Sequence, residues 1–147
     1  MSRFFKFFDS SQSADQIEEA VDPIQLATVV LMIEMARADF HQDDLEDQKI
    51  IDLLEHHFDL SHEDAVALFT RGQKKADDSV SLHEFTSTLH TNLSQADKEE
   101  VIGLLWQLAM VDEKLDRYED YLVRKVADLL YVSNTVVLRI RHQVTAK

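Results

Sequence analysis

The sequence contains no cysteine, only two glycines and only one proline in 147 residues. The absence of cysteine excludes disulfides, thiolate metal sites and a cysteine nucleophile, and it fits a reducing compartment. Few glycines and prolines leave few signals for turns or helix breaks, whereas Leu, Ala, Glu, Asp and Gln are frequent. Strand-like alternation is scarce. These features predict an all-α protein.

Basic residues are also few, with 15 Lys plus Arg against 28 Asp plus Glu and a formal charge of -13. A negative net charge argues against a protein that binds along the nucleic-acid backbone. It favours binding of cations or of basic partner surfaces. No apolar run reaches the ~18 residues of a membrane span. The start "MSRFFKFF" lacks the apolar core and the cleavage site of a signal peptide. We therefore expect a soluble, cytoplasmic protein.

Apolar residues recur at helical spacing in about seven segments of the chain. Predicted helix starts are Asp22 followed by Pro23, Asp43, Ser61, Ser81 with Glu84, Ser94 with Asp97, Asp116, and Ser133. The helix from Ser61 is expected to run toward Gly72. We divide the chain into an N-terminal aromatic and polar segment, residues 1–20, and one helical domain, residues 21–147. A chain of this length can bury roughly 68–70% of its unfolded surface.

The segment "ARADFHQDDLED" at 36–47 recurs without a gap as "AMVDEKLDRYED" at 109–120, a shift of 73 positions. The surrounding pattern of helix, acidic loop, helix, turn and helix recurs as well, in units at about 26–70 and 99–142. The register slips by one residue at the turn. A unit of this length indicates duplication of a helical substructure, so we predict a bundle of two related halves around a pseudo-twofold axis.

Both acidic segments carry the D-x-x-E spacing of a helix cap, at Asp43 to Glu46 and at Asp116 to Glu119. Such carboxylates stabilise the first turn of a helix, by about 1 kcal/mol per helix. Capping alone therefore explains these four acids.

Capping does not explain Asp39 and Asp112, which come four residues earlier, where the preceding helix ends and its dipole disfavours negative charge. Both positions indicate a nearby positive charge, either a metal ion or a Lys or Arg side chain. Oxygen ligands suit Ca²⁺, Mg²⁺ or Mn²⁺, although the glycine and the spacing of an EF-hand loop are absent. The candidate metal ligands are Asp39, Asp43, Glu46, Asp112, Asp116 and Glu119.

The segments "ARADFHQDDLEDQKIIDLLEHHFDLS" and "VDEKLDRYEDYLVRKVADLLYVS" resemble the two halves of the TerB-like family, the tellurite-resistance-associated helical domain. "LATVVLMIEMARAD" and "SVSLHEFTSTL" are similar to a bacterial subgroup of that family, and the resemblance covers about residues 20–145. It implies an all-α fold, a cytoplasmic or membrane-associated setting, and divalent-metal binding by the same six acids. Where the family loop usually has glycine after the aspartate, this chain has Phe40 and Glu113.

Other groups of residues give weaker indications of a metal site or a catalytic site. Neither His62 nor His83 completes an H-E-x-x-H zinc motif, and His56 and His57 point roughly 100° apart on a helix. No glycine-rich phosphate loop and no activated nucleophile is visible. We therefore expect a protein that is not an enzyme.

The start of the chain interleaves Arg3 and Lys6 with four phenylalanines, Phe4, Phe5, Phe7 and Phe8. Such a segment either makes weak contact with a membrane surface or packs against protein, and two basic residues favour packing or partner contact. The leading hypothesis for the whole chain is a TerB-like domain that binds divalent cations in a stress-response or envelope-associated setting. The alternative is an acidic scaffold or adaptor that binds a protein partner without metal.

Overall fold

The computed structural model describes residues 21–38, 44–78, 81–110 and 117–145, and within these ranges the chain forms helices and no strand. The described helices are α2 (Pro23–Ala38), α3 (Asp44–Phe58), α4 (His62–Asp78), α5 (His83–Asn92), α6 (Gln95–Ala109), α7 (Arg117–Leu129) and α8 (Asn134–Thr145). This confirms the all-α prediction. The N-terminal segment 1–20 lies outside the described residues. Among the helices described, none is long and apolar enough to cross a membrane.

The predicted caps form at four helix starts. The side chain of Asp22 accepts a hydrogen bond of 2.8 Å from the backbone N–H of Ile24. Three serines accept from the N–H three residues later, at distances of 3.1 to 3.3 Å: Ser61 from Asp64, Ser94 from Asp97, and Ser133 from Val136. Each bond satisfies an N–H group that lacks a partner within its helix, so these residues fix where the helices begin.

Two sequence expectations differ from the structure. The hydroxyl of Ser81 accepts from the N–H of His83, two residues on, and α5 begins at His83 with Leu82 as its N-cap. The predicted capping box with Glu84 is therefore replaced by a tighter turn. Helix α4 does not end near Gly72 but continues to Asp78, because that glycine allows two helices to approach closely and does not terminate one.

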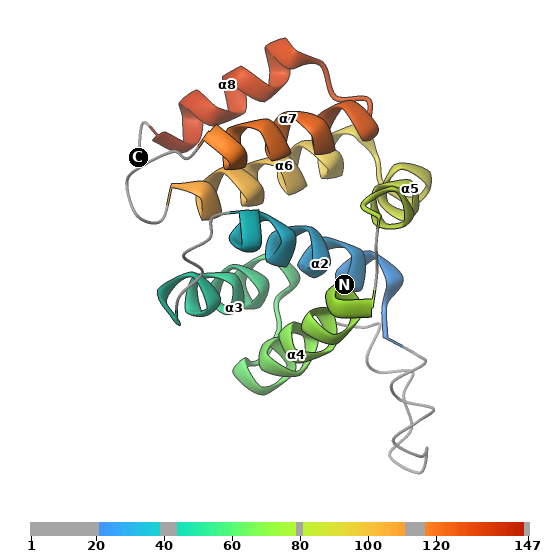
Figure 1. Cartoon of the computed structure of the whole chain (residues 1–147), viewed down its shortest axis with the longest axis vertical. Coiled ribbons are helices and arrows are strands. Elements are labelled where there is room, and N and C mark those ends of the chain that lie inside the picture. Colours follow the sequence, from blue (N-terminus) through green and yellow to red (C-terminus); the bar gives the residue numbers. More distant parts are fainter. Residues whose placement is uncertain (1–20, 39–43, 79–80, 111–116, 146–147) are drawn as a thin grey trace.

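Helix α2 lies at the centre of the bundle and contacts α3, α4, α5, α6 and α7. In Figure 1, α3 and α4 lie below it, and α6 and α7 lie above it, with α8 packed on α6 and α7. The sequence accounts for this position, because almost every residue from Ala27 to Ala36 is apolar. A helix that is apolar all round is stable only when neighbours surround it.

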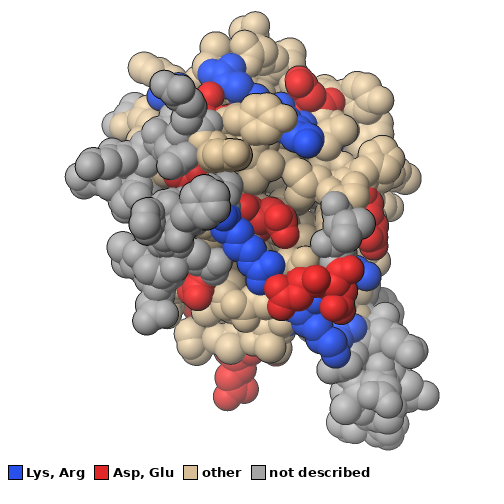
Figure 2. Space-filling view, in the orientation of Figure 1, with Lys and Arg blue, Asp and Glu red and all other residues tan. Residues whose placement is uncertain are grey.

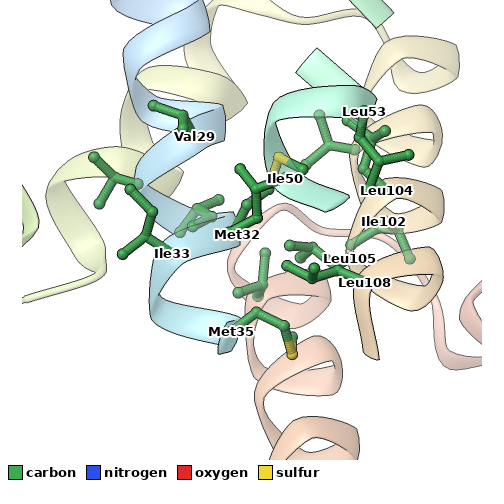
Figure 3. Packing of buried hydrophobic residues seen from close by; sticks show 14 of the residues in the cluster. Val29, Met32, Ile33, Met35, Ile50, Leu53, Ile102, Leu104, Leu105 and Leu108 are labelled. Carbon is green, nitrogen blue, oxygen red and sulfur yellow. The ribbon is translucent and has the colours of Figure 1, made fainter. Parts of the chain in front are cut away.

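The core is continuous across the molecule. Figure 3 shows side chains from α2, α3 and α6 meeting in it, with Met32, Ile50 and Leu105 among them. The largest fully buried side chain is Trp106 of α6, whose indole N–H donates to the backbone carbonyl of Val137 at 3.1 Å. This hydrogen bond links α8 to α6.

Candidate functional site

The six predicted metal ligands divide into two groups. Asp39, Asp43, Asp112 and Asp116 lie outside the described residues. Glu46 and Glu119 are described, each as the third residue of its helix, α3 and α7 respectively. The two glutamates thus occupy matching places, in agreement with the 73-residue shift.

Both glutamates are buried, with 6% of Glu46 and 3% of Glu119 exposed to solvent. Carboxylates are rarely buried to this extent unless other groups compensate the charge. Each of the two takes part in a polar or electrostatic interaction with another group. The first turn of a helix contributes part of this compensation, because its N–H groups and its dipole favour negative charge.

The scaffold brings the two acidic helix starts to one end of the bundle. Helices α3 and α7 both pack against the central α2. In Figure 1, the last turns of α2 and α6 and the first turns of α3 and α7 lie at the same end of the molecule. The helix starts that carry Glu46 and Glu119 therefore lie toward the same end in Figure 1, although α3 and α7 are not among the strongly contacting pairs of described helices.

The two helices also end in the same way. After α3, Asp59 has a φ of 54° and the N–H of Leu60 donates to the carbonyl of Glu55; after α7, Tyr131 has a φ of 60° and the N–H of Val132 donates to the carbonyl of Ala127. Both turns follow the pattern in which a left-handed residue closes a helix. The two left-handed residues are 72 positions apart in the chain.

A further acid, Asp120 in the first turn of α7, has basic partners. The carboxylate of Asp120 accepts from Nε of Arg124 at 2.9 Å and lies 3.9 Å from Nη1 of Arg141. Arg124 also donates to the side chain of Asn134. This acid contributes to packing between α7 and α8. Within the described ranges, no group of three or more His, Asp and Glu side chains has an arrangement that could hold a metal ion.

Comparison with protein-family models matches residues 25–142 to the family described as tellurite resistance protein TerB. The chain belongs to the TerB family. The TerB match begins in α2, ends in α8, and includes both helices that carry the buried glutamates. Searches of curated proteins and of solved structures found no match.

Sequence reasoning did not find the groove of the TerB domain that lies between α3, α6 and α8, with a volume of about 630 Å³. It arises from the way in which three helices meet, and only the apolar face of each helix is visible in the sequence. His56 and His57 lie at this groove. Burial lowers the pKa of His57, although the nearby Glu100 and Asp97 raise it and His56 lowers it further.

Two further histidines, His62 and His90, have local partners. His62 pairs with the carboxylate of Glu55 at 2.9 Å. Nδ1 of His90 lies 2.7 Å from the amine of the buried Lys98, and its ring packs against Tyr131. These contacts link neighbouring helices.

Proposed function

We propose that this TerB domain binds a divalent cation through the acids at the starts of α3 and α7, namely Asp39, Asp43, Glu46, Asp112, Asp116 and Glu119. The observation that carries the proposal is the matched burial of Glu46 and Glu119 at one end of the bundle. Membership of a family described as tellurite resistance protein supports a stress-response or envelope-associated setting.

The energetics favour a cation. Removing a carboxylate from water costs several kcal/mol even after the protein relaxes, whereas a helix N-terminus returns about 0.3–1 kcal/mol. A divalent ion bound at either helix start would add positive charge near the buried carboxylate there, beside the interactions that each glutamate already makes. Because all six candidates offer oxygen atoms, Ca²⁺, Mg²⁺ and Mn²⁺ are the expected ions.

Isothermal titration with Ca²⁺, Mg²⁺, Mn²⁺ and Zn²⁺ tests the proposal. We expect heat of binding with the wild type and none with the double variant Glu46→Gln, Glu119→Gln, which keeps the side-chain shape but removes both charges. Asp39→Asn with Asp112→Asn should also abolish the heat. The matched control is Glu63→Gln, in the first turn of α4 and exposed, which should bind as the wild type does.

Thermal unfolding provides a second measurement. A cation at ~100 times its dissociation constant should stabilise the wild type by about 2.7 kcal/mol, and the double glutamine variant by nothing. If no cation produces heat or stabilises the wild type, the proposal is wrong. Equal binding by wild type and double variant would place the ion elsewhere.

The second candidate function is a protein-interaction module, and the groove between α3, α6 and α8 favours it. The net charge of -13 would steer basic partners toward the domain. On the face shown in Figure 2, however, basic and acidic side chains are interspersed. Ion pairs also join Arg37 to Asp77 and Lys75 to Glu84 in the described part of the chain. The groove therefore gives a more specific basis for partner recognition than charge alone.

A further inference from the structure

The groove has one helix as its floor and two as its walls. Helix α6 forms the floor from Ala96 to Met110, α3 forms one wall between residues 49 and 57, and α8 forms the other between residues 139 and 144. Helix α6 contacts both walls, whereas α3 and α8 are not among the strongly contacting pairs of described helices. The walls therefore stand apart along the length of the floor.

Apolar and polar residues share the lining of the groove. Leu53, Leu104 and Ile140 line it but are almost fully buried, whereas Ala96, Gly103 and Met110 line it at seven-residue spacing and are exposed or half-buried. A β-carbon added to Gly103 would meet only Cγ2 of Ile140, at an ordinary contact distance of 3.6 Å. A ligand can therefore approach the backbone of α6 closely at this point.

The walls determine which kind of backbone can enter. All three helices satisfy their own backbone hydrogen bonds, and the groove offers no sheet edge to an extended chain. A helix satisfies its own N–H and C=O groups, so it can cover this floor without a sheet edge. The floor from Ala96 to Met110 is roughly 21 Å long, which accommodates about four helical turns.

Opposite charges lie at the two ends of the groove. Glu100 lies near His57 at one end, and Lys49 lies two turns earlier on α3. Because α3 and α6 run in opposite directions in Figure 1, Lys49 belongs to the end formed by the last turn of α6. Neither Lys49 nor Glu100 forms an ion pair in the described part of the chain, whereas Arg139 and Glu99 pair with each other at 2.7 Å.

We infer that this groove binds an amphipathic helix of a partner protein, which lies along α6 and runs in the same direction. Its apolar stripe would cover Ala96, Gly103 and Met110 along the floor and Val144 on the wall formed by α8. A basic residue near its N-terminal end would pair with Glu100, and an acidic residue two to three turns later would pair with Lys49. The dipole of the bound helix favours the same polarity, because its positive end would face Glu100 and its negative end Lys49. The inference deepens the interaction-module function and does not depend on cation binding.

The test uses two fluorescent peptides of about 16 residues, long enough to span the groove. Both carry the same Leu stripe on an Ala-rich helix. The matched peptide has Arg in its first turns and Glu in its last turns, and the swapped peptide has these charges exchanged. Binding is measured by fluorescence anisotropy at low ionic strength with EDTA, so that no divalent ion contributes. We expect the wild type to prefer the matched peptide on the order of tenfold.

Two variants probe the two parts of the inference. Lys49→Glu with Glu100→Lys reverses both ends and should reverse the preference between the peptides. Gly103→Leu fills the floor and should weaken both peptides at least about tenfold. Gln95→Leu is the matched control, because it adds the same side chain at an exposed position of α6 that does not line the groove. It should bind as the wild type does, and circular dichroism should show that all variants are folded.

Several outcomes would overturn the inference. Equal binding of the two peptides by the wild type and by the charge-reversed variant would exclude the charge pairing. Unchanged binding by Gly103→Leu, or amide chemical-shift changes outside α3, α6 and α8, would exclude the groove but leave an interaction elsewhere possible. Sedimentation that shows a wild-type dimer, lost in Gly103→Leu, would assign the groove to a second copy of this chain.

Discussion

A β-carbon built on Gly72 of α4 would lie 2.6 Å from Cγ1 of Val29 on α2 and 3.0 Å from Cδ1 of Ile33. The two helices therefore pack at a distance that only glycine permits. We expect Gly72→Ala to lower the free energy of unfolding by about 1–3 kcal/mol through overpacking, even though alanine is the better helix former. Urea unfolding followed by circular dichroism measures the change.

Gly103→Ala is the matched control, since it makes the same substitution in the interior of α6, where the added carbon has room. Here helix propensity should dominate, and the free energy of unfolding should rise by up to about 1 kcal/mol. If both variants were stabilised, the close contact between α2 and α4 would not limit the packing.

The glycines show why sequence predicts helices better than it predicts their packing. At Gly72 the sequence was interpreted as the approach to a helix end, because glycine is a poor helix former. Its actual role depends on Val29, more than 40 positions away in the chain, which helical periodicity cannot reveal. Caps such as Ser94 were predicted correctly, because their hydrogen bonds reach only three residues along the chain.

The side chain of Gln25 is fully buried in α2, and among the residues that the structure describes neither its amide oxygen nor its amide nitrogen has a hydrogen-bond partner. Leaving such groups unsatisfied costs about 1–3 kcal/mol. Gln25→Met keeps the length of the side chain and removes both polar groups, so we expect it to raise the free energy of unfolding by about that amount. The control Gln95→Met, at an exposed site, should change it by less than about 0.5 kcal/mol. A loss of stability in Gln25→Met would contradict this account and indicate that water satisfies the amide.

Stability should also depend on the protonation of His57. Burial lowers the pKa of His57 from its ordinary value of 6.5, and Glu100 and Asp97 oppose this effect only in part. As the pH falls through the unfolded value, the unfolded chain binds a proton before the folded chain does. Neutral His57 therefore makes its full contribution to the free energy of unfolding above about pH 7. This contribution is lost as the pH falls toward the lowered pKa of the folded state.

Denaturant unfolding between pH 7.5 and 5 checks this expectation. His57→Gln should show a smaller decrease in the free energy of unfolding across this range than the wild type does. The control is His142→Gln, at an exposed position of α8. If His57→Gln and the wild type lost stability in parallel, another group would be responsible.

The candidate site could be located from the sequence only as a pattern of repeated acids. The repeat placed Glu46 and Glu119 in corresponding first turns, because the 73-residue shift is a property of the chain itself. Their burial could not be predicted, since it depends on how α3 and α7 pack against α2. The groove was missed for the same reason, because Lys49 and Glu100 belong to different helices and become related only in the folded bundle.

The left-handed residues that close α3 and α7 make a final comparison possible. Asp59 and Tyr131 have φ values of 54° and 60°, a conformation that costs a residue with a β-carbon roughly 1–2 kcal/mol. Asp59→Gly should therefore raise the free energy of unfolding by up to about 1 kcal/mol, because the relief of strain is only partly offset by the larger conformational entropy that glycine loses on folding. Tyr131→Gly gains the same relief but loses the contact with His90, whose ring centroid lies 4.6 Å from that of Tyr131.

An aromatic contact of this kind is worth about 0.5–1.5 kcal/mol, so we expect Tyr131→Gly to be close to neutral. A double-mutant cycle with His90→Ala separates the two effects, because in that background the ring contact is already absent. Tyr131→Gly should then stabilise the protein about as much as Asp59→Gly stabilises the wild type. Equal gains from Tyr131→Gly with and without His90 would mean that the ring contact contributes nothing and that the relief of backbone strain alone sets the effect of Tyr131→Gly.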